Sequence, residues 1–435
     1  MRAKWLGAAA MALFAAQPAG AQTEIQFWHA MGGQLGDTLA QLVDGFNKRQ
    51  KDYVVKLVYK GSYTETMTGA IAAFRARQHP TIVQVFEVGT ANMMAAKGAI
   101  KPVYEIMAEA KEPFDPKAYL GAVYGYYSTT DGKLLSMPFN SSSPVLYWNK
   151  AAFTKAGLDP EKPPKTWPEM GDMSKKLLAS GMKCGFSTGW PSWIQIENMG
   201  AWHNVPFATK QNGFGGLDIQ LTINSPVHVK HITQLGEWHK EGIFVYGGRE
   251  NKPNAKFSSG ECAMFMGSTG LAGGFERTMK EPFGMTVLPY WPDVPGAPQN
   301  GVLGGATLWV LSGKSANEYK GVAKFFSYLS EAEVQAGWHQ KTGYVPITTA
   351  AYELTRKQGF YEKNPGRDIA VKQLDNKPPT ENTKGLRIGN FVQIRDIIDE
   401  ELEQVWAGKK TAKQALDDAV KRGNEQLRAF ESANK

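Results

Sequence analysis

The chain has 435 residues, of which 42% are hydrophobic and 21% charged, with a formal net charge of +8 at pH 7. This length exceeds what one hydrophobic core usually supports, so we expect two domains. The sequence has no basic run interleaved with aromatic residues, which argues against nucleic-acid binding. The positive excess is typical of a lysine-rich surface and does not by itself identify an anionic ligand.

The first 21 residues have the pattern of a secretory signal peptide. Arg2 and Lys4 precede an apolar stretch, residues 5–16, and residues 19–21 (AGA) offer a cleavage site of the A-x-A type. The stretch is too short to span a bilayer, and no later segment reaches 18 apolar residues. We therefore expect residues 1–21 to be cleaved and the chain to be exported to the periplasm.

Strand and helix patterns alternate along the segment that follows. Strands are expected at residues 24–28, 54–59 and 81–86, and helices at residues 35–46, 63–77 and 90–97. Alternating units with short connections predict a parallel, doubly wound sheet. Ligands of such sheets bind beyond the carboxyl ends of the strands. His29, Tyr63 and Glu87 fall at these ends.

Residues 136–170 begin with a small polar segment. An extended entry at residues 136–138 leads to four polar residues, 140–143 (NSSS), and then to a strand at residues 145–148. The polar residues can present hydroxyl and N–H groups to an anion; an ordinary polar turn is the alternative. A short helix at residues 151–156 and a helix capped by Thr166 complete the segment.

The later part of the chain predicts further strands and helices. Helices are expected at residues 226–240, at residues 317–329 and after the capping residue Thr411. Strands are expected at residues 284–289 and 301–310, and the second contains the pair Gly304 and Gly305, which lets backbone come close to a neighbour. Cys184 and Cys262 are the two cysteines of the chain. An oxidising compartment permits a disulfide, but the sequence leaves the pairing open.

Residues 136–170, SMPFNSSSPVLYWNKAAFTKAGLDPEKPPKTWPEM, resemble the segment with which extracellular solute-binding proteins of the maltose/glycerol-phosphate group enter their second lobe. The resemblance extends from about Ile25 to the C-terminus. It implies an α/β fold of the type II periplasmic binding proteins, with two lobes, each a mainly parallel sheet flanked by helices, and a ligand cleft at the hinge. The implied N-terminal lobe is residues 22–137 and 290–346, and the implied C-terminal lobe is residues 138–289 and 347–435.

Within this group, the sequence is similar to members that bind sn-glycerol-3-phosphate. The resemblance implies a periplasmic protein that captures this ligand for the permease subunits of an ABC transporter in the inner membrane. The choline diester, glycerophosphocholine, is a further candidate ligand. No cofactor and no metal is implied, and the protein is expected to act as a monomer. Contacts from a ligand to both lobes would stabilise a closed state.

The resemblance assigns ten residues to the ligand: Tyr63, Glu87, Ser142, Trp190, Trp193, Ser268, Gly304, Gly305, Tyr344 and Arg395. A phosphomonoester is bound best by Arg, hydroxyls and free N–H groups, and these are the expected roles of the serines, the glycine backbone, Tyr344 and Arg395. Tyr63 and Glu87 are expected to bind the glycerol part, with Glu87 accepting from its hydroxyls. The tryptophans are expected to stack on the glycerol carbons or to face a quaternary ammonium.

Each of these residues also has an ordinary structural interpretation. Tyr63 can pack on the sheet at a helix start, and Glu87 can open the next helix, where negative charge is favourable. The glycine pair can form a bulge. A lone arginine such as Arg395, expected before a helix, is usually a solvated side chain. The resemblance favours the binding roles over these interpretations.

Two alternative functions follow from the sequence. The first is a protein of the same fold that binds a sugar or oligosaccharide, although a neutral sugar rarely requires a guanidinium such as that of Arg395. The second is a secreted phosphodiesterase, because residues 185–189 fit the nucleophile pattern G-x-S-x-G. That pattern requires a helix directly after it, and Trp190 and Pro191 follow instead. We therefore expect no enzyme activity.

Metal and nucleotide sites are not indicated. His228 and His231 stand three residues apart, but no carboxylate or third histidine follows at a ligand spacing, so we expect a surface helix there. The sequence contains no Walker loop and no G-x-G-x-x-G, so nucleotide hydrolysis must belong to a partner.

Overall fold

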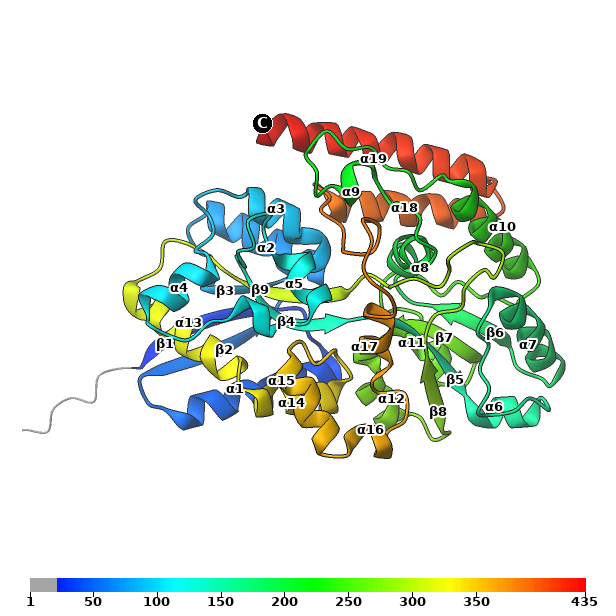
Figure 1. Cartoon of the computed structure of the whole chain (residues 1–435), viewed down its shortest axis with the longest axis horizontal. Coiled ribbons are helices and arrows are strands. Elements are labelled where there is room, and N and C mark those ends of the chain that lie inside the picture. The colour runs from blue at the N-terminus through cyan, green and yellow to red at the C-terminus, as the bar shows by residue number, and fades with distance from the viewer. Residues whose placement is uncertain (1–21) are drawn as a thin grey trace, which may run out of the picture.

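The computed structural model describes residues 22–435, so the signal peptide expected at residues 1–21 lies outside the described residues. Two β-sheets, each flanked by helices, form two lobes that lie side by side, with the first sheet on the left and the second on the right of Figure 1. The expected two-lobed α/β architecture is confirmed. Within residues 22–435, no helix is long and apolar enough to cross a membrane.

The first sheet contains five strands in the order β2-β1-β3-β9-β4. β1 pairs in parallel with β2 and β3, whereas β9 is antiparallel to both β3 and β4, so four strands share one direction. The strands are β1 Thr23–His29, β2 Tyr53–Tyr59, β3 Ile82–Phe86, β4 Met137–Ser142 and β9 Gly304–Val310. The helices of this lobe are α1 Gly33–Arg49, α2 Tyr63–Arg75, α3 Thr90–Ala95, α4 Val103–Glu109, α5 Gly121–Tyr127, α13 Ala316–Leu329 and α14 Ala332–Thr342.

The second sheet contains four strands in the order β6-β7-β5-β8. β6 and β7 are parallel, and β5 is antiparallel to β7 and β8. The strands are β5 Pro144–Asn149, β6 Cys184–Thr188, β7 Cys262–Ser268 and β8 Phe283–Thr286. The remaining helices are α6 Lys150–Lys155, α7 Trp167–Ala179, α8 Met199–Trp202, α9 Thr209–Asn212, α10 Pro226–Lys240, α11 Asn254–Ser258, α12 Ala272–Thr278, α15 Thr349–Lys357, α16 Phe360–Lys363, α17 Ile369–Leu374, α18 Phe391–Trp406 and α19 Ala412–Asn434.

The helices begin where their capping residues predict. Thr166 accepts a hydrogen bond from the Glu169 N–H at 3.3 Å, and the Glu169 carboxylate accepts from the Thr166 N–H at 3.1 Å, which closes a capping box at the start of α7. Thr411 caps α19 in the same way. Ser225 caps α10 as expected, but this helix is not a surface helix, because His228 and His231 are fully buried.

The chain enters the second lobe later than the sequence suggested. Residues 140–142 do not form a turn: they continue β4 and pair with residues 304–306 of β9 after a bulge near Pro138. β5 starts at Pro144, so the first crossing lies at Ser143 and not at residue 138. The expected boundary at residue 347 is also too early, because Thr348 still pairs with Tyr119 of the first lobe.

Gln373 of α17 ties the crossing segments together. Its Nε2 donates to the Pro144 carbonyl oxygen at 2.5 Å and to Ser143 Oγ at 2.7 Å, and its Oε1 accepts from the Leu288 N–H at 2.8 Å. Its carbonyl oxygen accepts from the Gly301 N–H at 3.1 Å. A fully buried amide therefore joins three segments at the hinge.

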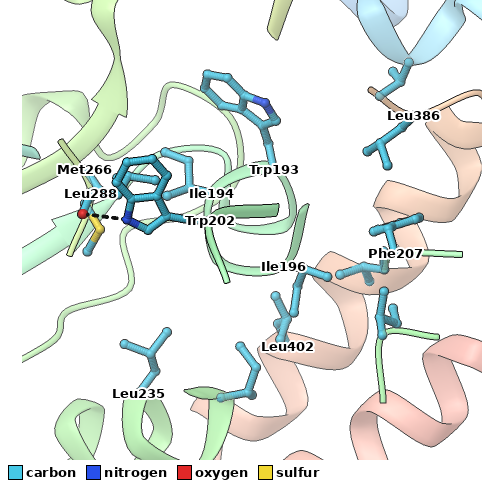
Figure 2. Packing of buried hydrophobic residues seen from close by; sticks show 14 of the residues in the cluster. Trp193, Ile194, Ile196, Trp202, Phe207, Leu235, Met266, Leu288, Leu386 and Leu402 are labelled. Atoms are coloured by element: carbon cyan, nitrogen blue, oxygen red, sulfur yellow. Dashed lines mark hydrogen bonds between the residues drawn. The ribbon is translucent and has the colours of Figure 1, made fainter. Parts of the chain in front are cut away.

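The core of the second lobe surrounds a short π-helix, η3 Trp193–Asn198, which is buried along its whole length. Figure 2 shows Ile194 and Ile196 of this helix packed among apolar side chains from α10, α18 and the second sheet. Trp202 is held there by a hydrogen bond from its indole N–H to the Leu288 carbonyl oxygen at 3.0 Å. π-Helical turns are often found at functional sites.

A disulfide joins Cys184 and Cys262. The sequence alone had left this pairing open. The two residues are direct partners in the parallel pair β6 and β7, and their Cα atoms are 4.6 Å apart. The bond therefore closes a loop of 78 residues within the second lobe.

Replacement of both cysteines by alanine is expected to lower the free energy of unfolding of the second lobe by about 2–4 kcal/mol, because the unfolded chain regains the entropy of an open loop. Urea denaturation followed by circular dichroism measures this change. Reductant should destabilise the parent protein and leave the double variant unchanged. Equal urea midpoints for parent and variant would contradict this role.

Candidate functional site

A cavity lies between the two sheets and is lined by both lobes. Nine of the ten residues assigned to the ligand line it: Tyr63, Glu87, Ser142, Trp190, Trp193, Ser268, Gly305, Tyr344 and Arg395. The remaining lining residues are Leu35, Phe86, Asn251, Gly270 and Leu271. The structure thus gathers, at one place, residues that are as far apart in the chain as Tyr63 and Arg395.

The first lobe contributes residues that follow or end its strands. Tyr63 is the first residue of α2, Glu87 directly follows β3, and Ser142 ends β4. Gly305 lies at the start of the antiparallel strand β9, and Tyr344 follows the end of α14. The carboxyl ends of β3 and β4 and the amino end of β9 meet at the same edge, which is why these residues converge.

The second lobe contributes residues from the ends of β6 and β7 and from α18. Trp190 and Trp193 follow β6, and Ser268 ends β7. Ser268 Oγ accepts from the Gly270 N–H at 3.0 Å, so its own hydroxyl proton is free to donate. Arg395 lies inside α18 and not before a helix, which corrects the sequence-based placement.

Gly304 is the expected residue that does not line the cavity. A Cβ atom at Gly304 would lie 2.4 Å from the Trp193 indole. Because glycine has no Cβ atom, the indole can pack directly against β9. Gly305 has φ +98°, and a Cβ atom there would lie 1.9 Å from the Asn140 carbonyl oxygen. Glycine is therefore required at both positions for different steric reasons.

Arg395 is buried between two carboxylates. Its Nε and Nη2 donate to the two oxygens of Glu197 at 2.7 and 2.8 Å, and Nη2 also donates to Glu87 Oε1 at 2.6 Å. Arg395 is 5% exposed, Glu197 is 2% exposed and Glu87 is 4% exposed. Because Glu87 belongs to the first lobe and Arg395 to the second, this ion cluster connects the lobes.

The cluster contains two acidic groups for one guanidinium. Burial raises the pKa of Glu87; the positive charge of Arg395 acts in the opposite direction, and the neighbouring Glu197 adds to the increase. Burial disfavours the charge of Arg395, but the two carboxylates outweigh it and raise its pKa above the ordinary value. Arg395 is therefore always charged.

Glu197 was not predicted from the sequence. It lies on η3, one turn from Trp193, and its side chain is 1% exposed. The sequence offered one signal for this role: Glu197 is a single acidic residue in an apolar segment that includes Ile194, Ile196 and Trp202. A carboxylate buried in such a segment requires a cationic partner.

A hydrogen-bonded chain supports the tyrosine side of the cavity. Tyr63 Oη accepts from Asn140 Nδ2 at 2.9 Å, and Asn140 Oδ1 accepts from Gln84 Nε2 at 2.8 Å. The Tyr63 ring stacks on Phe86 with a centroid distance of 5.3 Å and an interplanar angle of 7°. Burial raises the pKa of Tyr63 and of Tyr344, so both phenols stay protonated and can donate.

The two tryptophans have different environments. Trp190 is partly exposed, has φ +44° and donates from its indole N–H to Asn251 Oδ1 at 2.8 Å. Its ring lies 6.4 Å from the Tyr63 ring, centroid to centroid. Trp193 is 4% exposed and is packed against Gly304. Trp190 thus offers accessible aromatic surface, whereas Trp193 forms a buried wall.

The chain matches the bacterial extracellular solute-binding protein family over residues 41–368. It is 56% identical over 431 residues to the sn-glycerol-3-phosphate-binding periplasmic protein UgpB of Pectobacterium atrosepticum, covering 98% of this chain and 97% of the relative. The protein of the same name from Salmonella typhimurium (strain LT2) is 55% identical over 416 residues, which cover 95% of each chain.

Solved structures show the same fold. UgpB from Mycobacterium tuberculosis in complex with glycerophosphocholine matches with a TM-score of 0.78 at 21% identity, covering 94% of this chain and 99% of that one. Maltose-bound MalE3 of T. maritima matches with a TM-score of 0.76 at 17% identity, covering 93% and 99%. At these identities the likeness concerns the fold alone.

Gly305→Ala is expected to lower the free energy of unfolding by about 1–3 kcal/mol, because a non-glycine residue is strained at this φ and its Cβ meets the Asn140 carbonyl oxygen. Thermal or urea denaturation measures the change. Gly337→Ala is the matched control, since a Cβ atom at this position of α14 has no neighbour within 4 Å. A Gly305→Ala protein as stable as the control variant would contradict the steric requirement.

Proposed function

We propose that this chain, which belongs to the family of bacterial extracellular solute-binding proteins, captures sn-glycerol-3-phosphate in the periplasm for import by an ABC transporter. Relatives that share more than half of their residues with it are named for binding this ligand. The family binds solutes for transport, which is not an enzymatic function. Residues 1–21 would direct export, and the receptor would deliver its ligand to the permease subunits as a monomer.

The observation that carries this proposal is the buried Arg395 at a cavity that is also lined by hydroxyl groups. Ser142, Ser268 and Tyr344 line the same cavity as Arg395. Glu87 and Glu197 bind Nε and Nη2 of Arg395, and within residues 22–435 its Nη1 donates no hydrogen bond. A phosphate group is recognised by this combination of a guanidinium donor and neutral O–H donors.

In this proposal the glycerol part is bound by Glu87, Tyr63 and Trp190, which line the same cavity. Glu87 uses only Oε1 to bind Arg395, so Oε2 remains for the glycerol hydroxyls. Tyr63 also lines the cavity, and Trp190 provides a partly exposed aromatic surface for the carbon atoms. The same surface would receive the quaternary ammonium of glycerophosphocholine through a cation–π contact.

Capture follows from the two-lobed arrangement. The phosphate donors Ser142 and Tyr344 belong to the first lobe, and Ser268 and Arg395 belong to the second. A ligand that touches all four stabilises the closed state relative to an open one. A neutral sugar would gain little from the buried guanidinium, which is why we favour the phosphate ester over the sugar.

Arg395→Ala is expected to weaken binding of sn-glycerol-3-phosphate by about 2–5 kcal/mol, because the variant leaves buried carboxylates without their cation and removes a phosphate donor. Isothermal titration calorimetry measures the affinity. Arg356→Ala is the control, because Arg356 is paired with Glu353 at the surface and its side chain is 57% exposed.

The same titrations separate the alternatives. Parent protein and the Arg356→Ala variant should bind sn-glycerol-3-phosphate equally and give no heat with maltose. Heat with maltose and none with the phosphate ester would assign the protein to carbohydrate binding. An Arg395→Ala variant that binds as tightly as the parent would show that the anion lies elsewhere.

A further inference from the structure

We infer that Glu197 is a positioning residue of the ligand site, which orients Arg395 and makes the capture of a dianionic phosphate require the uptake of one proton by Glu87. This inference rests on the proposed function, since it concerns how the same cavity receives a phosphate ester. Glu197 does not line the cavity, and it acts through Arg395.

The orienting role follows from the geometry of the ion pair. Both oxygens of Glu197 accept from Arg395, at 2.7 Å from Nε and at 2.8 Å from Nη2. Two parallel hydrogen bonds fix the plane of a guanidinium as well as its position. With that edge occupied, Nη1 is the nitrogen left for a ligand. Glu197 itself is fixed because it lies on the buried π-helix η3.

The proton requirement follows from the charges. Glu87, Glu197 and Arg395 together carry one excess negative charge when both carboxyl groups are ionised, and all three are at least 95% buried. A phosphate dianion entering the adjoining cavity adds two more negative charges with little water to screen them. Like charges in a buried site favour protonation of one of the groups.

Glu87 is the group that receives the proton. Both oxygens of Glu197 are engaged by Arg395, whereas Arg395 engages only Oε1 of Glu87. Glu87 also lines the cavity, so a proton on Oε2 can be donated to the ligand. The proton comes from solvent and is bound as the ligand enters. No bond other than this O–H forms.

Other titratable groups surround the cluster. Tyr63 on α2 and Tyr126 and Tyr127 on α5 stay protonated, because burial raises their pKa. On α18, burial raises the pKa of Asp399 to about 7; this carboxylate accepts from the Ser192 N–H and does not line the cavity.

Three further charged groups lie beyond this inner ring. Burial raises the pKa of Glu250 on the loop between α10 and α11, and Arg387 faces Tyr126. Arg249 lies near Asp399 and is paired with Glu403. Asp399 is the buried carboxyl group that most directly competes with Glu87 for a proton, which makes Asp399→Asn the matched control.

The test is calorimetric titration of sn-glycerol-3-phosphate at pH 8 in two buffers with different ionisation enthalpies. The free phosphate is a dianion at this pH, because its second pKa lies near 6. The parent protein should take up about one proton per bound ligand, and Glu197→Gln should take up less than roughly a quarter of a proton, because that variant removes the excess charge. Asp399→Asn should behave as the parent.

A second measurement uses the parent protein alone. Between pH 8 and 9 the ligand is a dianion, so affinity should fall about tenfold over this pH unit if one proton is bound with the ligand. Heats that do not depend on the buffer, or an affinity that is flat in this range, would overturn the inference and leave the proposed function intact.

The variants give two more decisive outcomes. Full proton uptake in Glu197→Gln, or its loss in Asp399→Asn, would assign the proton to another group and overturn the inference. The absence of any heat with the parent protein would instead overturn the proposed function, and the inference with it.

Discussion

The ion cluster of Arg395 with Glu87 and Glu197 is the interaction on which the binding site depends. It is buried, it joins the two lobes, and it places a guanidinium at the wall of a cavity that hydroxyl groups also line. Removing two carboxylates and a guanidinium from water is costly, and good geometry with matched hydrogen bonds is needed to offset that cost. The fold supplies this geometry by carrying the three residues on η1 (Glu87–Gly89), η3 and α18.

The hinge and the site are built from neighbouring residues. Ser142 lines the cavity, Ser143 is the crossing residue, and Gln373 binds that crossing to two other segments. A change in the angle between the lobes therefore acts directly on the residues that line the cavity. The side chain of Trp193 contributes to this coupling, because its indole, carried by the second lobe, packs against Gly304 of the first sheet.

Most of the secondary structure was predictable because it is encoded locally. The capping residues Thr166, Ser225 and Thr411 begin helices where the sequence places them. The errors occurred where tertiary contacts override local pattern. Residues 140–142 read as a polar turn but continue β4, because β9 supplies their hydrogen-bond partners from 164 residues later in the chain (Ser141 to Gly305). His228 and His231 read as surface residues but are buried, where hydrogen bonds to Ile196 and Gln195 satisfy their rings.

The sequence by itself determined the lobed α/β architecture and nine of the fourteen residues that line the cavity, through the alternating patterns of residues 24–97 and a family resemblance that extends from about Ile25 to the C-terminus. Tertiary structure alone decided the pairing of Cys184 with Cys262, the insertion of Arg395 within α18 and the role of Glu197. The physical reason is that the charge balance of the Arg395 cluster depends on which distant segments of the chain the fold brings together. Glu197 and Arg395 are 198 residues apart in the chain, and no local pattern reports that they meet.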